Sequence, residues 1–174
     1  MNKSMSSKSL ALGGILTALT VVSVFFADIM PTNTLSLYAL SSFFVSVFLI
    51  ERGVKAAWTF YFATSLLSFI IVPDKTMVIP FISFFGVYGI IKHYIEKYTK
   101  RIIEYTLKYL FFNANVILAY FLMKALFEAQ TLFKGAPLWV VFIALQPILL
   151  IYDYVYTLFI QYYISKLRRV LKIK

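Results

Sequence analysis

Long apolar runs separated by short polar breaks organise this chain from end to end. A helix that crosses the hydrocarbon core of a membrane needs about 20 apolar residues, with a range of about 17–25. The pattern therefore predicts an all-α integral membrane protein, a compact bundle of six transmembrane helices that forms a single domain over residues 1–174. The predicted spans are roughly Leu10–Ala27, Leu35–Ile50, Ala56–Val72, Met77–Ile91, Ile103–Phe127 and Leu138–Ile164.

The breaks between these runs contain residues that favour turns. Pro31 and Asn33 follow the first run, and Gly53 separates the second from the third. The first run is too long for the core of a typical signal peptide, and no clear small-x-small cleavage site follows it before Pro31. It is therefore expected to remain as the first span.

The charge distribution supports a membrane location and predicts an orientation. The chain is 61% hydrophobic, has a mean hydropathy of +0.84 and carries a formal net charge of +10. The basic residues sit at the edges of apolar runs, where anionic lipid headgroups attract them, so no nucleic acid partner is expected. All but three of the 17 Lys and Arg residues (Lys75, Lys124 and Lys134) fall at the termini or in the second and fourth connections. The positive-inside rule then places both termini in the cytoplasm of a multi-pass protein of the cell membrane.

The fourth connection, residues 91–110, has a helical pattern of its own. Apolar and aromatic residues recur at spacings of three and four, with charged residues between them. This pattern predicts an amphipathic helix in the cytoplasmic interface. Its role is either simple anchoring or the docking of a partner. The apolar set is Ile91, Tyr94, Ile95, Tyr98, Ile102 and Tyr105, and the charged set is Lys92, Glu96, Lys97, Lys100 and Arg101.

Several kinds of chemistry have no support in the sequence. The chain has no cysteine, no phosphate-binding G-x-x-x-x-G-K-[ST] loop and no H-E-x-x-H motif. Its only histidine, His93, is expected at the surface, and one histidine cannot build a His-rich metal site. We therefore expect no enzyme activity, no cofactor and no metal.

Polar residues nevertheless interrupt the fifth span. At about 100° per residue, one helix face carries a stripe from the inner to the outer end. Asn115 lies off this stripe and needs a different neighbour. The stripe consists of Tyr109, Asn113, Tyr120 and Lys124.

The sixth span carries a matching face with Trp139, Gln146, Asp153 and Thr157. If the two spans run antiparallel, Asn113 and Asp153 lie at similar depth. Polar groups inside a membrane either satisfy one another between helices or line a cavity for a ligand. Both interpretations are open, and Lys124 can also extend its ammonium group to the headgroups. The candidate substrate-binding residues are Asn113, Asn115, Tyr120, Lys124, Trp139, Gln146 and Asp153.

Small residues form a stripe on the first span. Ser7, Ala11, Gly14 and Ala18 follow one another at spacings of four, three and four, so they share one helix face. Small residues let another helix approach closely, whether it belongs to this chain or to another protein.

The chain resembles the substrate-binding S-components of energy-coupling factor transporters. The resemblance lies in its size, its six predicted spans, its basic termini and the stretch SLALGGILTALTVV near the N-terminus. Those proteins carry an A-x-x-x-A motif on their first helix, and Gly14 to Ala18 is a G-x-x-x-A version that Ala11 extends. The resemblance implies a subunit that binds a vitamin-like micronutrient as its small-molecule substrate. It implies docking through Ala11, Gly14 and Ala18 onto a transmembrane coupling protein driven by ATPase subunits.

A second family has a similar layout. Small six-span scaffold proteins of the rod-shape MreD type bind membrane partners and transport nothing. This alternative predicts no outward-facing pocket. It places an interaction surface on lipid-facing aromatic residues such as Phe43, Phe44 and Phe48.

Overall fold

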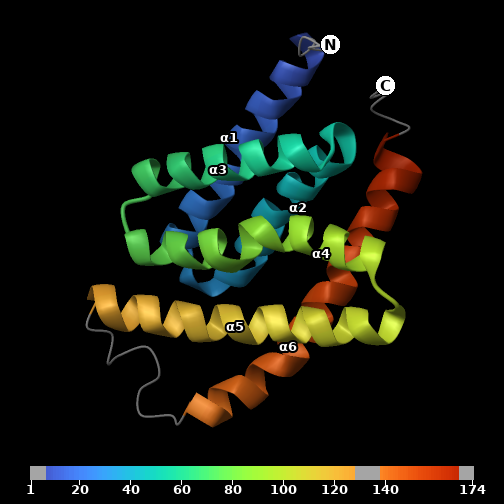
Figure 1. Cartoon of the computed structure of the whole chain (residues 1–174). Coiled ribbons are helices and arrows are strands. Elements are labelled where there is room, and N and C mark those ends of the chain that lie inside the picture. Colours follow the sequence, from blue (N-terminus) through green and yellow to red (C-terminus); the bar gives the residue numbers. More distant parts are fainter. Residues whose placement is uncertain (1–6, 128–137, 169–174) are drawn as a thin grey trace. The chain divides into compact units, whose positions relative to one another are not determined.

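The computed structural model describes residues 7–127 and 138–168, and within these residues the chain is helical and contains no strand (Figure 1). Three short segments, η1 (Pro31–Asn33), η2 (Lys75–Val78) and the π-helix η3 (Phe81–Phe85), lie between or before the long helices. A second π-helical turn, η4 (Tyr163–Leu167), follows α6. The six long helices are α1 (Ser7–Ile29), α2 (Thr34–Arg52), α3 (Val54–Ile71), α4 (Gly86–Tyr98), α5 (Arg101–Phe127) and α6 (Leu138–Tyr162).

The apolar runs therefore predicted the number and order of the long helices correctly. Among the described residues, four helical segments are long and apolar enough to cross a membrane, which supports a membrane protein. A bundle of six spans in one domain remains a prediction. The four segments are Leu10–Ile29, Pro31–Arg52, Val54–Ile71 and Lys75–Tyr98.

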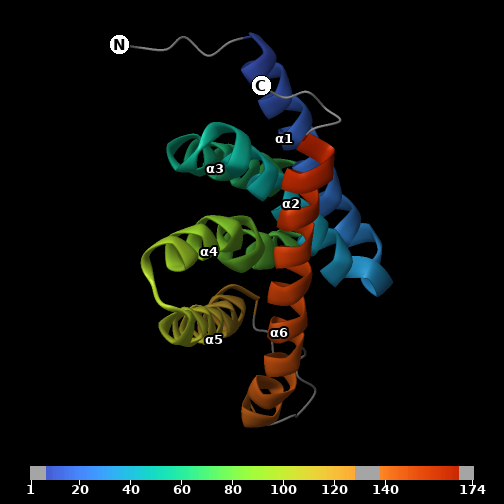
Figure 2. The same ribbon diagram turned by 90° about the vertical axis from the view of Figure 1, so that its right-hand side faces the viewer.

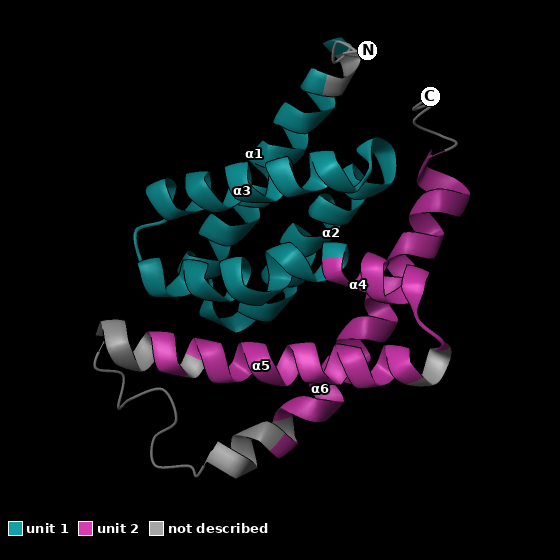
Figure 3. Cartoon of the chain, viewed as in Figure 1, with its two compact units in different colours: residues 1–90 teal, residues 91–174 magenta. Residues whose placement is uncertain are grey.

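The chain divides into two compact units, residues 1–90 and residues 91–174 (Figure 3). In the first unit, α1 packs against both α2 and α3, which also pack against each other. Their contact faces are unusually rich in small hydroxyl residues, which allow helix backbones to approach closely. Several of these hydroxyls donate to a backbone carbonyl of their own helix. The Thr20 hydroxyl, for example, donates to the carbonyl of Leu16 at 2.8 Å. The buried hydroxyl residues are Thr20, Ser23, Ser41, Ser42, Ser46, Thr64, Ser65 and Ser68.

A single residue, Gly53, connects α2 to α3. Its φ of +81° lies in the region that a side chain disfavours, so glycine makes the sharp reversal possible. Its N–H donates to the carbonyl of Leu49 at 2.8 Å, which satisfies one of the free carbonyls at the end of α2. The Glu51-Arg52-Gly53 break expected from the sequence is therefore a tight turn between packed helices.

Two tyrosines fix the chain that leads into α4. The Tyr61 hydroxyl of α3 donates to the carbonyl of Ile82 in η3 at 2.6 Å. The Tyr38 hydroxyl of α2 donates to the carbonyl of Met77 in η2, and its ring stacks on Phe85. A π-helical turn leaves backbone groups out of the ordinary helical register. The hydrogen bond from Tyr61 satisfies one such group within the first unit.

Gly86 follows this turn and has no room for a side chain. A Cβ at this position would lie 2.9 Å from the Tyr61 ring and 3.0 Å from the carbonyl oxygen of Phe81. Gly86→Ala is therefore expected to lower the free energy of unfolding by about 1–3 kcal/mol, the usual cost of overpacking. Gly14→Ala is the matched control, because nothing lies within 4 Å of its Cβ position. That change should be neutral or stabilising by up to about 1 kcal/mol through helix propensity. Denaturant titration in detergent micelles measures both, and equal values for the two would contradict this packing.

The small-residue stripe of α1 lies on its exposed face. Ala11, Gly14 and Ala18 are exposed, whereas Leu16 and Val24 are buried. The stripe is thus not covered by the described part of the chain.

One aromatic position expected to face lipid does not. Phe48 is buried, and its ring stacks on Phe60 with centroids 4.5 Å apart. Its ring also lies 3.3 Å from the Cβ position of Gly13, so the absence of a side chain there makes room for it. Phe43 and Phe44 are half-buried. The proposed aromatic surface is therefore wrong at Phe48, because glycine in α1 creates a pocket for that ring.

Candidate functional site

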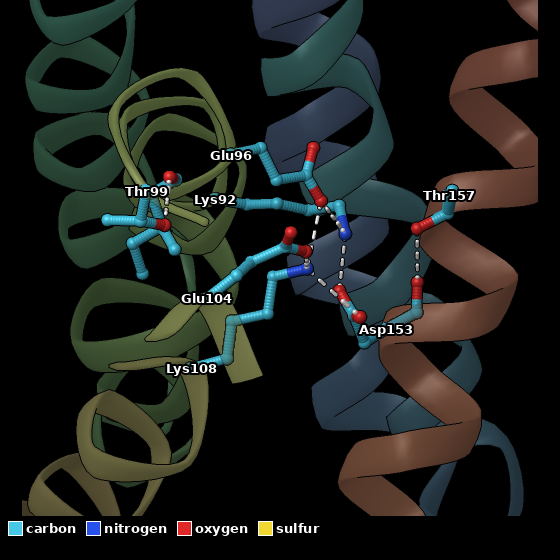
Figure 4. A network of polar contacts seen from close by, with 8 residues as sticks. Lys92, Glu96, Thr99, Glu104, Lys108, Asp153 and Thr157 are labelled. Atoms are coloured by element: carbon cyan, nitrogen blue, oxygen red, sulfur yellow. Dashed lines mark hydrogen bonds and ion pairs between the residues drawn. The ribbon is translucent and has the colours of Figure 1, made fainter. Parts of the chain in front are cut away.

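Five charged side chains converge in the second unit. Lys92 and Glu96 lie one turn apart on α4, and Glu104 and Lys108 lie one turn apart on α5. Side chains at this spacing are neighbours on a helix surface, so each pair forms locally. Asp153 of α6 joins the two pairs, as Figure 4 shows. The five residues are named here the ionic cluster.

A break between α4 and α5 brings the two local pairs together. The helix stops after Tyr98, where the Thr99 hydroxyl donates to the carbonyl of Ile95 at 2.6 Å. The next helix begins at Arg101. The chain reverses here, and Glu104 and Lys108 come to face Lys92 and Glu96 (Figure 4). The prediction of a single interfacial helix over residues 91–110 is therefore wrong, because two helices share this segment.

The bonding pattern of the cluster is a closed ring with one appended group. The Lys92 ammonium contacts Glu96 Oε1 at 2.6 Å and also Asp153 Oδ1. The Lys108 ammonium contacts the same Glu96 oxygen at 2.8 Å and Asp153 Oδ2 at 3.2 Å. Both carboxylates thus bridge both lysines. Glu104 contacts Lys108 at 2.6 Å.

Burial makes this cluster important energetically. The side chains of Lys92 and Lys108 are 1% and 4% exposed, while Glu96 is 39% exposed. Removing an ammonium group from water costs several kcal/mol unless close opposite charges compensate. The carboxylates therefore compensate the buried charges of the two lysines. Ionisable groups inside apolar helical proteins are rare and usually serve function.

The helix α6 supplies Asp153 and crosses α5 obliquely within the second unit (Figures 1 and 2). Thr157, one turn further, donates its hydroxyl to the backbone carbonyl of Asp153 at 2.8 Å, and not to the carboxylate. The sequence placed Asn113 level with Asp153. The structure instead pairs Asp153 with Lys108, more than one helical turn before Asn113.

Asn113 and Gln146 contact each other directly. The Gln146 amide Nε2 donates to Asn113 Oδ1 at 2.9 Å, and Asn113 Nδ2 donates to the carbonyl of Tyr109. This arrangement is the one that interhelical packing predicts. Asn115, which lies off the polar stripe, donates to the carbonyl of Phe111 at 2.8 Å. Its side chain therefore finds a partner within its own helix.

Three further candidate residues lie on α5 and α6. Tyr120 and Lys124 belong to α5 and Trp139 belongs to α6, but their side chains lie outside the described part of the structure. Their substrate-binding role, like that of Asn113, Asn115, Gln146 and Asp153, remains a prediction. His93 is exposed, as expected.

A double-mutant cycle measures the contribution of the Asn113–Gln146 hydrogen bond to stability. Replacing either residue by leucine is expected to destabilise the protein, and the double variant should lose less than the sum of the two. The expected coupling is about 0.6 kcal/mol, and at most about 1.7 kcal/mol, which is the range for hydrogen bonds between membrane helices. Denaturant titration of the four proteins gives this value, with Asn115→Leu as a control that should not couple to Gln146. Strict additivity of Asn113→Leu and Gln146→Leu would contradict the contact.

The sequence contained signals for the ionic cluster that its pattern alone did not join. The spacing of four between Lys92 and Glu96, and again between Glu104 and Lys108, fits a helical ion pair. Asp153 stood out as the acidic residue well inside an apolar run. The helix break, which brings the three groups together, was not foreseen.

Comparison with known proteins gives no assignment: no family model, no curated protein and no solved structure matches this chain.

Proposed function

We propose that this chain is the membrane-embedded substrate-binding subunit of an uptake transporter for a vitamin-like micronutrient. Separate coupling and ATPase subunits would supply the energy, in the manner of energy-coupling factor transporters. In this proposal six helices cross the cell membrane, both termini are cytoplasmic, and the protein itself catalyses no reaction. The basic residues at the termini support this orientation.

The observation that carries the proposal is the exposed small-residue face of α1. Ala11, Gly14 and Ala18 lie exposed on this helix, and the space at the Gly14 Cβ position is open for 4 Å. A helix from another membrane protein can approach such a face closely, because no large side chain holds it away. This is the surface through which the resemblance implies docking onto a coupling protein.

Gly14→Leu and Ala18→Leu test this surface. Each adds a bulky group at a close helix contact, and overpacking costs about 1–3 kcal/mol. Capture of the coupling and ATPase subunits should therefore fall roughly tenfold or more, since 1.4 kcal/mol corresponds to a factor of ten. The measurement is co-purification from the native membrane, with thermal unfolding of the free subunit unchanged. Ala63→Leu, at an exposed position of α3, is the matched control and should capture normally. Unaltered capture by both α1 variants would exclude a docking role.

Substrate binding needs its own test. The candidate residues with undescribed side chains, Tyr120, Lys124 and Trp139, lie near the end of α5 and the start of α6, which the proposed orientation puts at the outer side of the membrane. Mass spectrometry of the protein extracted in detergent should detect a bound small molecule. Lys124→Met and Trp139→Ala should lose it, while Asn115→Leu, whose amide binds its own helix, should retain it. A protein that never carries a small molecule would contradict the transport role.

The scaffold alternative has one specific observation in its favour. The Asn113–Gln146 hydrogen bond joins α5 and α6 directly, as expected of polar packing in a protein without a ligand cavity. With Phe48 buried, its aromatic surface would reduce to Phe43 and Phe44. A scaffold would show partner capture that depends on α1 but no bound small molecule, so the two experiments above distinguish the alternatives.

A further inference from the structure

The last two turns of α4 expose aromatic rings and bury a charged side chain. Tyr98 is 70% exposed and Tyr94 is 39% exposed, and Lys97 is exposed beside them. Lys92, on the same turns, has a side chain that is only 1% exposed. A helix that faces water shows the reverse arrangement, with its charges outside and its rings inside. The outer face of this helix end is therefore suited to surroundings that favour aromatic rings.

The exposed side chains of this face contact one another. The Tyr94 and Tyr98 rings, one helical turn apart, stack with their centroids 6.4 Å apart. The Lys97 ammonium lies 5.3 Å from the centroid of the Tyr98 ring, which is a cation–π distance. The His93 ring makes an edge contact with Tyr94 at a centroid distance of 6.4 Å. These four residues are named here the aromatic–lysine patch.

Lys97 is the cation of the patch, and its ammonium forms no ion pair or hydrogen bond with another described residue. Lys75, at the other end of the same membrane-length segment, differs in this respect. Its ammonium also lies near an aromatic ring, but it donates to the carbonyl of Val72 at 2.6 Å. A lysine ammonium has three N–H donors. Those of Lys97 are therefore available to an acceptor from outside the described chain.

The patch lies where a membrane-length segment ends. The segment Lys75–Tyr98 has 24 residues and is apolar enough to cross a membrane, and Tyr98 is its last residue. The hydrocarbon core needs about 20 helical residues, so the end of this segment extends to the headgroups. Tyrosine is enriched at that level because its ring is apolar and its hydroxyl is polar. The acceptors that an ammonium group meets there are lipid phosphates.

We propose that the aromatic–lysine patch binds the headgroup of an anionic phospholipid. The Lys97 ammonium donates to a phosphate oxygen, and the Tyr94 and Tyr98 rings lie against the glycerol backbone and the upper acyl chains. Lys100, three residues after Lys97, is exposed and forms no ion pair with a described residue. It adds positive charge at the same helix end, which further favours an anionic headgroup.

The patch favours an anionic lipid over a zwitterionic one. A choline or ethanolamine headgroup carries a cation next to its phosphate, and aromatic rings bind such cations. Here the Tyr98 ring already contacts the Lys97 ammonium, so a second cation would meet a like charge. A glycerol headgroup offers the phosphate without this repulsion. The inference requires a membrane location, and it stands whether or not the protein is a transport subunit.

Native mass spectrometry of the full-length protein in detergent micelles tests the proposal. Phosphatidylglycerol and phosphatidylcholine with the same acyl chains are the probes, and the wild type should bind phosphatidylglycerol more tightly. Lys97→Gln should weaken phosphatidylglycerol binding about fivefold, which corresponds to about 1 kcal/mol for one basic residue at an anionic surface. Tyr98→Ala should weaken it about two- to fivefold, because the cation–π contact that positions the ammonium is lost.

Two matched controls separate the patch from general effects of charge and ring removal. Lys55→Gln makes the same change at an exposed lysine of α3, and Tyr154→Ala removes a 66% exposed ring of α6 that contacts no described lysine. Both should bind phosphatidylglycerol as the wild type does. All four positions are exposed, so the unfolding temperatures should stay unchanged.

Two results would overturn the proposal. If the wild type binds the two lipids equally well, the patch does not select an anionic headgroup. If Lys97→Gln loses no more phosphatidylglycerol binding than Lys55→Gln, the lipid responds to the overall charge of the protein and not to this patch. Neither result bears on capture of the coupling subunits or on a bound small molecule, so the proposed function is tested separately.

Discussion

Lys92→Met is expected to lower the free energy of unfolding by about 3–5 kcal/mol, the cost of breaking a buried ion pair by removing one partner. Methionine retains most of the apolar stem of lysine, so the loss reflects the charge. Lys92 is 1% exposed and contacts both Glu96 and Asp153. Its removal leaves three carboxylates around Lys108 alone. Denaturant titration in detergent micelles measures the loss.

Lys97→Met provides the matched control on the same helix. Lys97 is exposed, and its ammonium lies 5.3 Å from the centroid of the Tyr98 ring. An exposed cation–π contact contributes about 0.5–1 kcal/mol, so this variant should lose no more than that. If the two variants lose similar amounts, the buried ion pairs make no net contribution to stability.

The helices were predictable because hydrocarbon imposes a length on apolar runs. The run from Ala56 corresponds to α3, which begins two residues earlier at Val54, and the run from Leu138 begins with α6 itself. Gly53 and Pro31 marked breaks between helices, because glycine adopts a positive φ that other residues disfavour and proline lacks the N–H that a continuing helix needs. Such signals are local. They did not locate the start of α4, which begins at Gly86 rather than near Met77, because η2 and η3 occupy the first part of that run.

The ionic cluster was not predictable in the same way. The helical pattern of residues 91–110 is continuous in sequence, and only the break at Thr99 and Lys100 separates α4 from α5. On a single helix, Lys92 and Lys108 would lie about 24 Å apart, at 1.5 Å per residue. The reversal brings both to one Glu96 oxygen. Lys92, which was expected at the membrane surface, is therefore buried in the protein.

Packing between helices explains the other departures. Asn113 was expected at the level of Asp153, but Asp153 pairs with Lys108 and Asn113 contacts Gln146, which lies on the same predicted face of the sixth span. Phe48 was assigned to the lipid-facing surface with Phe43 and Phe44, but hydropathy alone cannot distinguish a lipid-facing aromatic residue from one in the core. The missing side chain of Gly13 decides that case. Both errors concern which neighbour a face meets, and that information is not local.

Asp153→Leu is expected to cost less than Lys92→Met, about 3 kcal/mol at the lower end for a broken buried pair. Without Asp153, Lys92 and Lys108 still face Glu96 and Glu104. Lys92 then keeps Glu96 as its partner, and Lys108 keeps both glutamates. The remaining cost comes from the lost ring contacts to the two ammonium groups.

The double variant Lys92→Met/Asp153→Leu should lose less free energy of unfolding than the sum of the losses of the two single variants. Lys108 then keeps Glu96 and Glu104 as partners, and methionine packs near leucine where an ion pair was lost. The expected coupling is about 0.5–3 kcal/mol, the range for residues that share one network. Denaturant titration of the four proteins under one condition gives the coupling, and pairing Lys97→Met with Asp153→Leu supplies the additive reference. Additive losses for Lys92→Met and Asp153→Leu would mean that the two residues do not belong to one energetic ring, whatever their distance in the structure.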